Sequence, residues 1–391
     1  MLVLDPTYQA LAIVRSVAKL GLSVAVGLPP GTYPVAMSRY VDEVWKHPDV
    51  SDVDAFCAAL QSFLAQRPNI AAIFPAGERY RLALIESGLA FTQPIVGVPE
   101  PLFSTCRDKV AANDLAQRAG LRVPSARVLH RFDEIAPAAA DIGYPVILKP
   151  YRNTSLIDGR KAVIVESPEQ LLTKLSGWPK QHTELIVQEY ISGAVESADF
   201  VARNGELVAY CEATTLRTDQ LDGTGYGVLF RSLAPADDLL RATREFAEHT
   251  CYSGPGLIQF IRSSDDGNIY FLENNPRLSA GVSTSMIWGQ DIPAITLEVA
   301  TSGLTDQHSP RFALEPQPYD YESDIYWLER DLEGYLRQRK QLSAEQRRHW
   351  RAQLRRTFQS TKHHVIWQFS DPLPSLLIFT RIALRWLRNK Y

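Results

Sequence analysis

Short apolar runs alternate with longer amphipathic runs over the first hundred residues. The apolar runs have the length and composition of buried strands, and they lie at residues 1–5, 22–29, 41–48 and 70–77. The runs at 8–21 and 52–66 carry apolar residues at helical spacing. Strand and helix in alternation are typical of an open parallel α/β sheet, which we predict through about residue 98.

The middle of the chain has a different pattern, richer in strands. Predicted strands lie within residues 142–151, 183–193, 199–213 and 254–275, and one long helix is predicted at 236–250. The dipeptides Asn204–Gly205 and Asp266–Gly267 are typical of tight turns between antiparallel strands. This pattern predicts an α+β domain that wraps around a ligand.

The last sixty residues are basic and helical. From Asp331 to Tyr391 there are 13 Lys and Arg against 4 Asp and Glu, a balance of +9, whereas the rest of the chain has a balance of −12. Ser343 is a predicted helix N-cap. In the final helix Arg381, Arg385 and Arg388 share one face.

That final helix has two interpretations. In the first, which we favour, Leu384 and Leu387 pack onto the protein and the arginines face water. In the second, the helix lies on an anionic membrane surface or on a partner.

Length and composition limit the other classes. With 391 residues we expect three parts: an α/β domain at 1–98, an α+β domain at 99–310 with a small ligand-covering subdomain at about 143–192, and a helical extension at 311–391. A net charge of −3 argues against a nucleic-acid partner. Four scattered cysteines, an N-terminus without a signal-peptide pattern and no apolar run near 20 residues favour a cytoplasmic protein.

Residues 270–281, "YFLENNPRLSAG", place polar side chains at the end of an apolar strand. Glu273 and Asn275 are two apart and therefore point to the same side, whereas Asn274 points to the other. Gln259 lies on the preceding strand. Carboxylate and amide oxygens suit Mg²⁺, and Arg277 beside them can stabilise phosphoryl charge.

Other residues complete an inventory for a magnesium nucleotide. Lys109 begins a helix and Lys149 ends a strand, and both can meet phosphate oxygens as point charges. The strand end "QEYIS" can offer backbone groups to an adenine edge, and a carboxylate a few residues later can accept from ribose hydroxyls. The first turn, "LDPTYQA", has no glycine, which argues against a dinucleotide-binding dehydrogenase.

Together these motifs resemble the ATP-grasp superfamily, of the carboxylate–amine ligase type. The chain is similar to the ATP-grasp domains of carbamoyl-phosphate synthetase and biotin carboxylase and to D-aspartate ligase, over about residues 1–305. The resemblance implies a pre-ATP-grasp α/β domain followed by an ATP-grasp domain, with ATP and Mg²⁺ (or Mn²⁺) as cofactors. It implies that a carboxylate is activated as an acyl-phosphate and then captured by an amine.

The resemblance also assigns roles residue by residue. The implied metal ligands are Gln259, Glu273 and Asn275. The implied nucleotide contacts are Lys109, Lys149, Ser155, Gln188, Glu189, Tyr190, Ile191 and Glu196. The implied catalytic residues are Lys149, Arg277 and, as a carboxylate or phosphate clamp, Arg231.

Two departures from the family pattern leave alternatives open. Gln259 stands where an acid is usual, and the phosphate-covering loop at 151–163 has only Gly159. An ATP-binding regulatory module without turnover is therefore the alternative function, and activation of bicarbonate is a third. We expect small-molecule carboxylate and amine substrates, contacted by loops at 28–34, 75–81 and 278–285, and a homodimer is left open.

Overall fold

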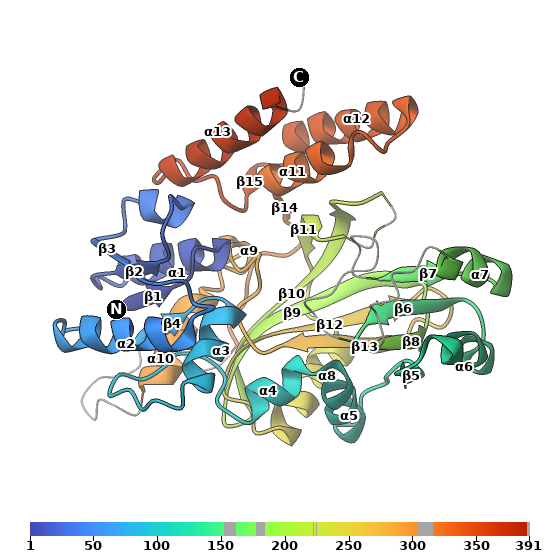
Figure 1. Ribbon diagram of the computed structural model, residues 1–391, viewed down its shortest axis with the longest axis horizontal. Coiled ribbons are helices and arrows are strands. Elements are labelled where there is room, and N and C mark those ends of the chain that lie inside the picture. Colours follow the sequence, from blue (N-terminus) through green and yellow to red (C-terminus); the bar gives the residue numbers. More distant parts are fainter. Residues whose placement is uncertain (152–161, 177–183, 222, 224, 303–315, 389–391) are drawn as a thin grey trace.

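Three β-sheets form the framework of the computed structural model (Figure 1). The structure describes residues 1–151, 162–176, 184–221, 223, 225–302 and 316–388. Two of the sheets have four strands and the third has seven.

The first sheet is parallel and has the order β3-β2-β1-β4. Its strands are β1 (Leu2–Leu4), β2 (Ala25–Leu28), β3 (Glu43–Lys46) and β4 (Ile73–Pro75). Its helices are α1 (Tyr8–Lys19), α2 (Val53–Ala65) and α3 (Glu78–Glu86), with a 3₁₀ turn η1 (Pro34–Met37). The predicted N-terminal parallel sheet is confirmed. Because the chain runs outward from β1 through β2 to β3 and then returns to add β4, the strand order reverses between β1 and β4.

The second sheet is small and antiparallel, with the order β5-β8-β6-β7. Its strands are β5 (Ala126–Leu129), β6 (Val146–Pro150), β7 (Val163–Val165) and β8 (Leu185–Glu189). The helices before and beside it are α4 (Leu102–Arg107), α5 (Lys109–Arg118), α6 (Ile135–Ile142) and α7 (Pro168–Ser176), with a 3₁₀ turn η2 (Phe132–Glu134). Its own apolar core joins Ile135, Val146, Leu148 and Val187.

The third sheet has the order β13-β12-β9-β10-β11-β14-β15. Its strands are β9 (Gly193–Arg203), β10 (Glu206–Thr218), β11 (Gly227–Ser232), β12 (Gly254–Ser263), β13 (Ile269–Asn275), β14 (Asp324–Tyr326) and β15 (His363–His364). Asn204 and Gly205 have φ angles of 52° and 90° and join β9 to β10, as the turn pattern predicts. The helices that follow its strands are α8 (Asp237–His249), α9 (Ser283–Ile287) and α10 (Ile292–Thr301).

The C-terminal segment is not a purely helical extension, contrary to the sequence-based expectation. It contains α11 (Leu328–Gln338), α12 (Ala344–Ser360, with Ser343 as N-cap) and α13 (Leu373–Arg388), but it also adds β14 and β15 to the seven-stranded sheet. These strands are short, and the local sequence pattern does not show that an open edge of the large sheet is available to pair with them.

A buried ion pair fastens this segment to the N-terminal layer. Arg15 of α1 donates to Asp371 Oδ2 at 2.9 Å and to the Ile366 carbonyl at 2.7 Å, and both charged side chains are 1% exposed. Asp371 also accepts from Ser38 Oγ at 2.8 Å. A second contact joins Arg217 of β10 to Asp331 of α11. The segment is therefore bound to two of the three sheets.

The predicted packing of Leu384 and Leu387 is wrong. Both leucines are about half exposed, whereas Ile378 and Ile382 of the same helix are buried. Helix α13 packs against α11 and η1, and the side that it turns toward them cannot be read from the sequence pattern of the helix alone. Among the described residues, no helix has the length and apolar character needed to cross a bilayer.

Candidate active site

A bulge in β13 decides which side chains face the candidate site. Phe271 pairs with Phe260, whereas Glu273 pairs with Gln259, so Leu272 is an extra residue between two successive pairs of the ladder. The two phenylalanines lie in a buried core. Because neighbouring residues of β12 point to opposite faces, Gln259 and Glu273 point away from that core.

The predicted metal residues share this second face of the sheet. Asn275 Nδ2 donates to Glu273 Oε1 at 2.8 Å, and Gln259 lies opposite Glu273 in the ladder. Arg277 follows at the strand end, where its Nη2 donates to Asn275 Oδ1 at 3.2 Å. Asn274 is 3% exposed and lies on the core side, as the alternation predicts. The structure thus brings these four predicted residues together.

Two lysines approach the same place from other elements. Lys149 ends β6, and its Nζ donates to Gln188 Oε1 at 2.6 Å. Lys109 begins α5, and its Nζ donates to the Pro150 carbonyl at 2.7 Å. Burial lowers the pKa of Lys149 to about 8, while the nearby Glu273 charge raises it and the Lys109 charge lowers it further. The ammonium groups and the Glu273 carboxylate are therefore near enough to interact.

The predicted adenine residues join the small sheet to the large one. Glu189 ends β8, and its Oε2 accepts from the Ser125 amide at 3.1 Å. The Tyr190 amide donates to the Pro145 carbonyl at 3.2 Å. Ile191 follows in the link to β9 and is partly exposed. These contacts hold the link beside Gln188 and Lys149, so the predicted nucleotide residues of β6 and β8 are adjacent.

Two predicted residues do not join this group. Glu196 pairs with Phe260 in the ladder and therefore lies on the opposite face from Gln259. It accepts from Arg262 Nε at 2.8 Å, and Arg262 also bonds Asp238 at the start of α8, so this carboxylate fastens α8 to the sheet.

Arg231 is the second, and its expected role as a clamp needs correction. Its guanidinium makes two hydrogen bonds with Asp324, at 2.6 and 2.9 Å. Arg231 is on β11, and strands β9 and β10 lie between β11 and β12 in the sheet. Three strand spacings place Arg231 roughly 14 Å from β12. The predicted phosphate contact Ser155 lies outside the described residues.

Sequence reasoning missed a buried carboxylate on the site face. Asp199 of β9 lies opposite Leu257, whose other neighbour in the ladder is Asn275. Ser279 Oγ donates to Asp199 Oδ2 at 3.3 Å, while Asp199 Oδ1 is buried and has no hydrogen-bond partner in the part of the chain that the structure describes. Burial raises the pKa of Asp199 to about 7, against the opposing charge of Arg277. No distinct signal marked Asp199, because the same strand also holds Glu196 and Ser197.

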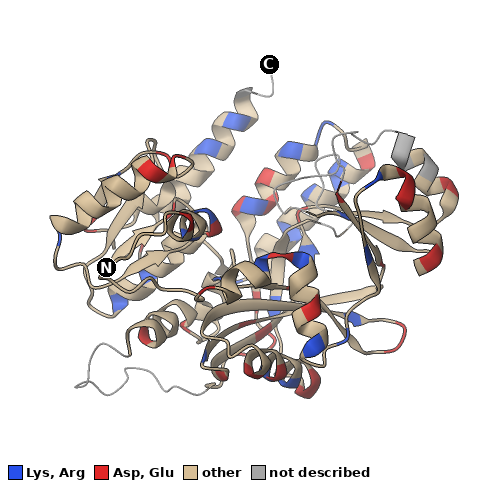
Figure 2. Cartoon of the chain, turned by 60° about the horizontal axis from the view of Figure 1, so that its bottom comes forward, with Lys and Arg blue, Asp and Glu red and all other residues tan. Residues whose placement is uncertain are grey.

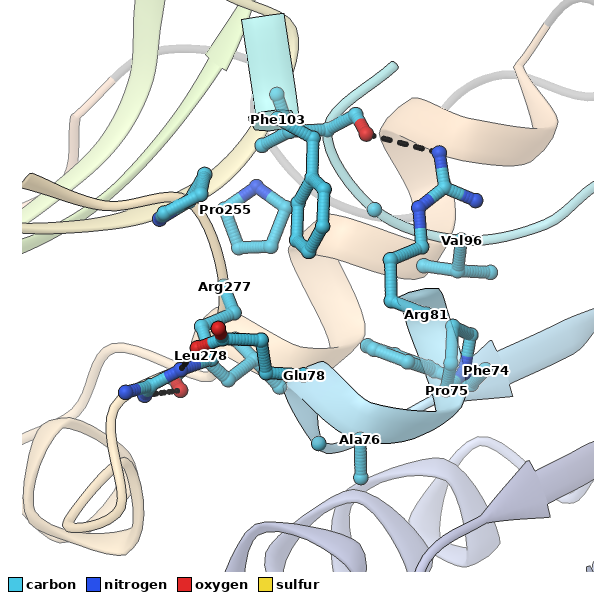
Figure 3. Close-up of a pocket in the computed structure, with 14 residues that line it drawn as sticks. Phe74, Pro75, Ala76, Glu78, Arg81, Val96, Phe103, Pro255, Arg277 and Leu278 are labelled. Carbon is cyan, nitrogen blue, oxygen red and sulfur yellow. Dashed lines mark hydrogen bonds and ion pairs between the residues drawn. The ribbon is translucent and has the colours of Figure 1, made fainter. Parts of the chain in front are cut away.

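A pocket lies where the N-terminal sheet meets the β12–β13 hairpin (Figure 3). Its lining includes Glu78, Arg81, Phe103 and Arg277. Arg277 Nε lies 3.8 Å from Glu78 Oε2, and Figure 3 shows these two side chains next to each other at one edge. Gly77 of the predicted substrate loop at 75–81 also lines the pocket.

Asp5 adds a third carboxylate near this pocket. It follows β1 with a φ of 129°, and its Oδ2 occupies the space where a Cβ on Gly77 would lie, so a larger residue at position 77 would displace the Asp5 carboxylate. Burial raises the pKa of Asp5 to about 6, although the Thr7 amide, Arg79 and Arg277 oppose the shift. Asp5 and Gly77 follow β1 and β4, where the strand order reverses and open α/β sheets place their ligands.

The chemistry of the donor set fits a hard cation bound together with phosphate. Glu273 supplies one carboxylate, and Gln259 and Asn275 supply amide oxygens from the same face. Such oxygens suit Mg²⁺, which keeps water and phosphate oxygens in its remaining positions. Among the described residues there is no cluster of three or more His, Cys, Asp or Glu side chains that would hold a metal without such a ligand.

Comparisons with known families agree with this geometry. A family model described as "ATP-grasp domain" matches residues 103–249. A second, described as "ATP-grasp in the biosynthetic pathway with Ter operon", matches residues 181–318. Together they cover the small sheet and most of the seven-stranded sheet.

Among curated proteins, the chain is similar to the arginine-specific large chain of carbamoyl phosphate synthase from Bacillus subtilis (strain 168). The two are 26% identical over 219 residues, which is 54% of this chain and 21% of that protein. The large chain from Halomonas eurihalina is 25% identical over 61% of this chain and 23% of its own length. The chain thus aligns with about a fifth of these relatives.

Solved structures with the same fold include a biotin carboxylase–β,γ-ATP complex from Campylobacter jejuni. Its TM-score is 0.60 at 18% identity, over 83% of this chain and 74% of that one. An L-amino acid ligase from Bacillus licheniformis has a TM-score of 0.57 at 16% identity, over 79% of this chain and 77% of that one. At these identities the likeness concerns the fold.

Proposed function

We propose, from the premise that this chain belongs to the ATP-grasp superfamily, that it is an ATP-dependent ligase that joins a small-molecule carboxylate to an amine. The observation that carries the proposal is the convergence of Lys109, Lys149 and Arg277 with Glu273 on one face of the sheet. Three cations beside one carboxylate suit a polyphosphate, and catalysis of phosphoryl transfer needs little beyond position and charge.

In the first step a carboxylate oxygen of the substrate attacks the γ-phosphorus of ATP. The bond from that phosphorus to the bridging oxygen breaks, ADP leaves and an acyl-phosphate forms. Lys109 and Lys149 hold phosphate oxygens, and Arg277 offsets charge on the transferred group. Mg²⁺, when bound with ATP by Gln259, Glu273 and Asn275, neutralises phosphate charge.

In the second step the amine nitrogen attacks the acyl carbon and inorganic phosphate leaves. The attacking nitrogen must lose one proton, and we assign its acceptance to Asp199. This assignment is supported by the unpartnered Oδ1, by the position beside Ser279 and Arg277, and by a pKa of about 7. The products are an amide, ADP and phosphate.

We place the amine substrate next to Arg277 and Asp199, beside the pocket between β4 and the β12–β13 hairpin, whose own volume of about 10 Å³ admits little more than one water molecule. Glu78, Asp5 and Asp199 all lie near Arg277. Arg107 also pairs with Glu78 and Arg79 lies near Asp5, so these acids leave no excess of negative charge. The unpartnered Oδ1 of Asp199 can accept a hydrogen bond from the amine nitrogen.

A screen of phosphate release over pairs of carboxylates and amines with Mg²⁺-ATP tests the proposal. Amine-dependent release of ADP and phosphate is expected. Glu273→Ala should abolish it, whereas Glu86→Ala, which changes an exposed glutamate of α3, should not. ATP binding without turnover for any pair would favour the regulatory module motivated by Gln259, and release with bicarbonate alone would favour the third function.

A further inference from the structure

Helix α13 has apolar side chains on two faces, and the described protein covers only one of them. Ile378 and Ile382 are 3% and 9% exposed and pack into the core. The exposed side carries what we call the leucine stripe. Its members and their exposed fractions are Leu373 (50%), Leu376 (47%), Leu384 (51%) and Leu387 (48%).

The stripe consists of two leucine pairs on one face of the helix, with the exposed Thr380 between them. At about 100° per residue, its four leucines fall within an arc of roughly 80°. The buried Ile378 and Ile382 lie roughly 140° to 180° from Leu373. Phe369, which precedes the helix, is 90% exposed and adds a further apolar side chain at its N-terminal end. An apolar strip of this length on a helix calls for a partner.

Positive charge lies to one side of the stripe. On the same projection Arg381 is roughly 60° and Arg385 roughly 100° beyond Leu384, and no Asp or Glu occurs anywhere in residues 373–388. In Figure 2 the helix that runs to the C-terminus carries blue bands and no red one. Figure 1 places α12 at the same end of the molecule. The exposed basic side chains around α12 are Arg348, Arg351, Arg355, Arg356 and Lys362.

This charge distribution discriminates between the two occupants that could cover the stripe. Glu333 of α11 lies near Arg385, but α13 itself carries arginines and no acid, so a second copy that set α13 against α13 would bring like charges together. An anionic lipid surface supplies acyl chains for the leucines and phosphate groups for the arginines. The segment from residue 331 onward has a net charge of +9, and the rest of the chain has a net charge of −12. An anionic surface would therefore also orient the molecule, with this segment toward the surface.

We propose that the leucine stripe of α13 binds the protein to an anionic membrane surface. The helix lies in the plane of the interface, with its leucines among the acyl chains and Arg381 and Arg385 at the headgroups. Arg381 also donates to the Thr32 carbonyl, which fixes the helix to the N-terminal layer. This inference does not depend on the reaction that the active site performs.

Sedimentation of the full chain with vesicles tests the proposal. Vesicles of phosphatidylcholine with phosphatidylglycerol should bind the protein, pure phosphatidylcholine should bind it weakly, and salt should weaken binding. The double variant Leu384→Ser/Leu387→Ser should lower the partition coefficient roughly tenfold or more, because it removes half of the apolar stripe. Arg385→Gln should lower binding and reduce its dependence on salt.

The matched control is Leu89→Ser/Leu216→Ser, which changes two exposed leucines outside the tail and should bind as the unchanged protein does. Because all four positions are exposed, circular dichroism should show native folding for both variants. Absence of binding to anionic vesicles, or equal binding by both double variants, overturns the proposal. Light scattering that shows a dimer which Leu384→Ser/Leu387→Ser dissociates overturns it in favour of a second copy.

Discussion

Lys149 should make ATP binding depend on pH in a range that is easily measured. Its Nζ lies 2.6 Å from Gln188 Oε1, and burial lowers its pKa to about 8. Only the protonated form offers a charge to phosphate oxygens. As pH rises through about 8 the ammonium loses its proton, so affinity for ATP is fully present below this pH and is lost above it.

The size of the effect follows from the fraction of protein that is protonated. With a pKa of about 8, that fraction is about one half at about pH 8 and about one tenth at about pH 9. Since the apparent dissociation constant is the intrinsic one divided by the competent fraction, affinity should fall roughly twofold and roughly tenfold at these two pH values. Bound phosphate favours the charged lysine, so binding at about pH 9 should take up nearly one proton per ATP.

Isothermal titration calorimetry in two buffers of different ionisation enthalpy measures both the affinity for ATP and the number of protons taken up on binding. Lys149→Arg keeps its charge at every pH used and should give a flat profile. Lys19→Arg, at an exposed position at the end of α1, should keep the unchanged protein's profile. A flat profile for the unchanged protein, or the same loss of affinity in Lys149→Arg, would refute the reasoning.

Three further predictions concern the site and the tail. Asp199→Asn should remove the rise of ligase activity with pH through about 7, since the proposed proton acceptor must be ionised to act; an unchanged pH–rate profile contradicts this. Glu273→Gln should slow ATP-dependent phosphate release roughly a hundredfold, with partial rescue by excess Mg²⁺, because the predicted metal set loses its one charge; full activity contradicts this. Arg15→Met should lower the free energy of unfolding by about 3–5 kcal/mol in urea denaturation, because Asp371 is left buried without its partner, and Arg15→Met/Asp371→Leu should recover part of this loss; a change below about 1 kcal/mol contradicts it.

The features predicted correctly from the sequence depend on neighbours along the chain. Alternation of strand and helix identified the N-terminal parallel sheet. The alternation of side chains along a strand placed Glu273 and Asn275 on one face and Asn274 on the other. Both inferences use only local geometry, in which the side-chain period of a strand is two and that of a helix is 3.6. The polar strand end was visible for the same reason.

The features that were missed depend on contacts between distant segments. Arg231 is 93 residues from Asp324, which engages its guanidinium, and Glu196 is 66 residues from Arg262. The local sequence around Arg231 and Glu196 is equally compatible with side chains that face the nucleotide, so it could not exclude that position. Asp199 was missed because its importance comes from burial beside Arg277, and burial is a property of the assembled sheet.

The bulge at Leu272 decides which residues of β13 face the site. A residue paired in or out of a ladder exchanges the two faces of the strand beyond that point. If Leu272 paired with Gln259 in a regular ladder, Glu273 would lie opposite Ile258 on the core side and Asn274 would replace it at the site. Because Leu272 makes no ladder pair, it should tolerate many substitutions, and its deletion should leave a regular ladder in which Glu273 still pairs with Gln259 and the ligand set is retained.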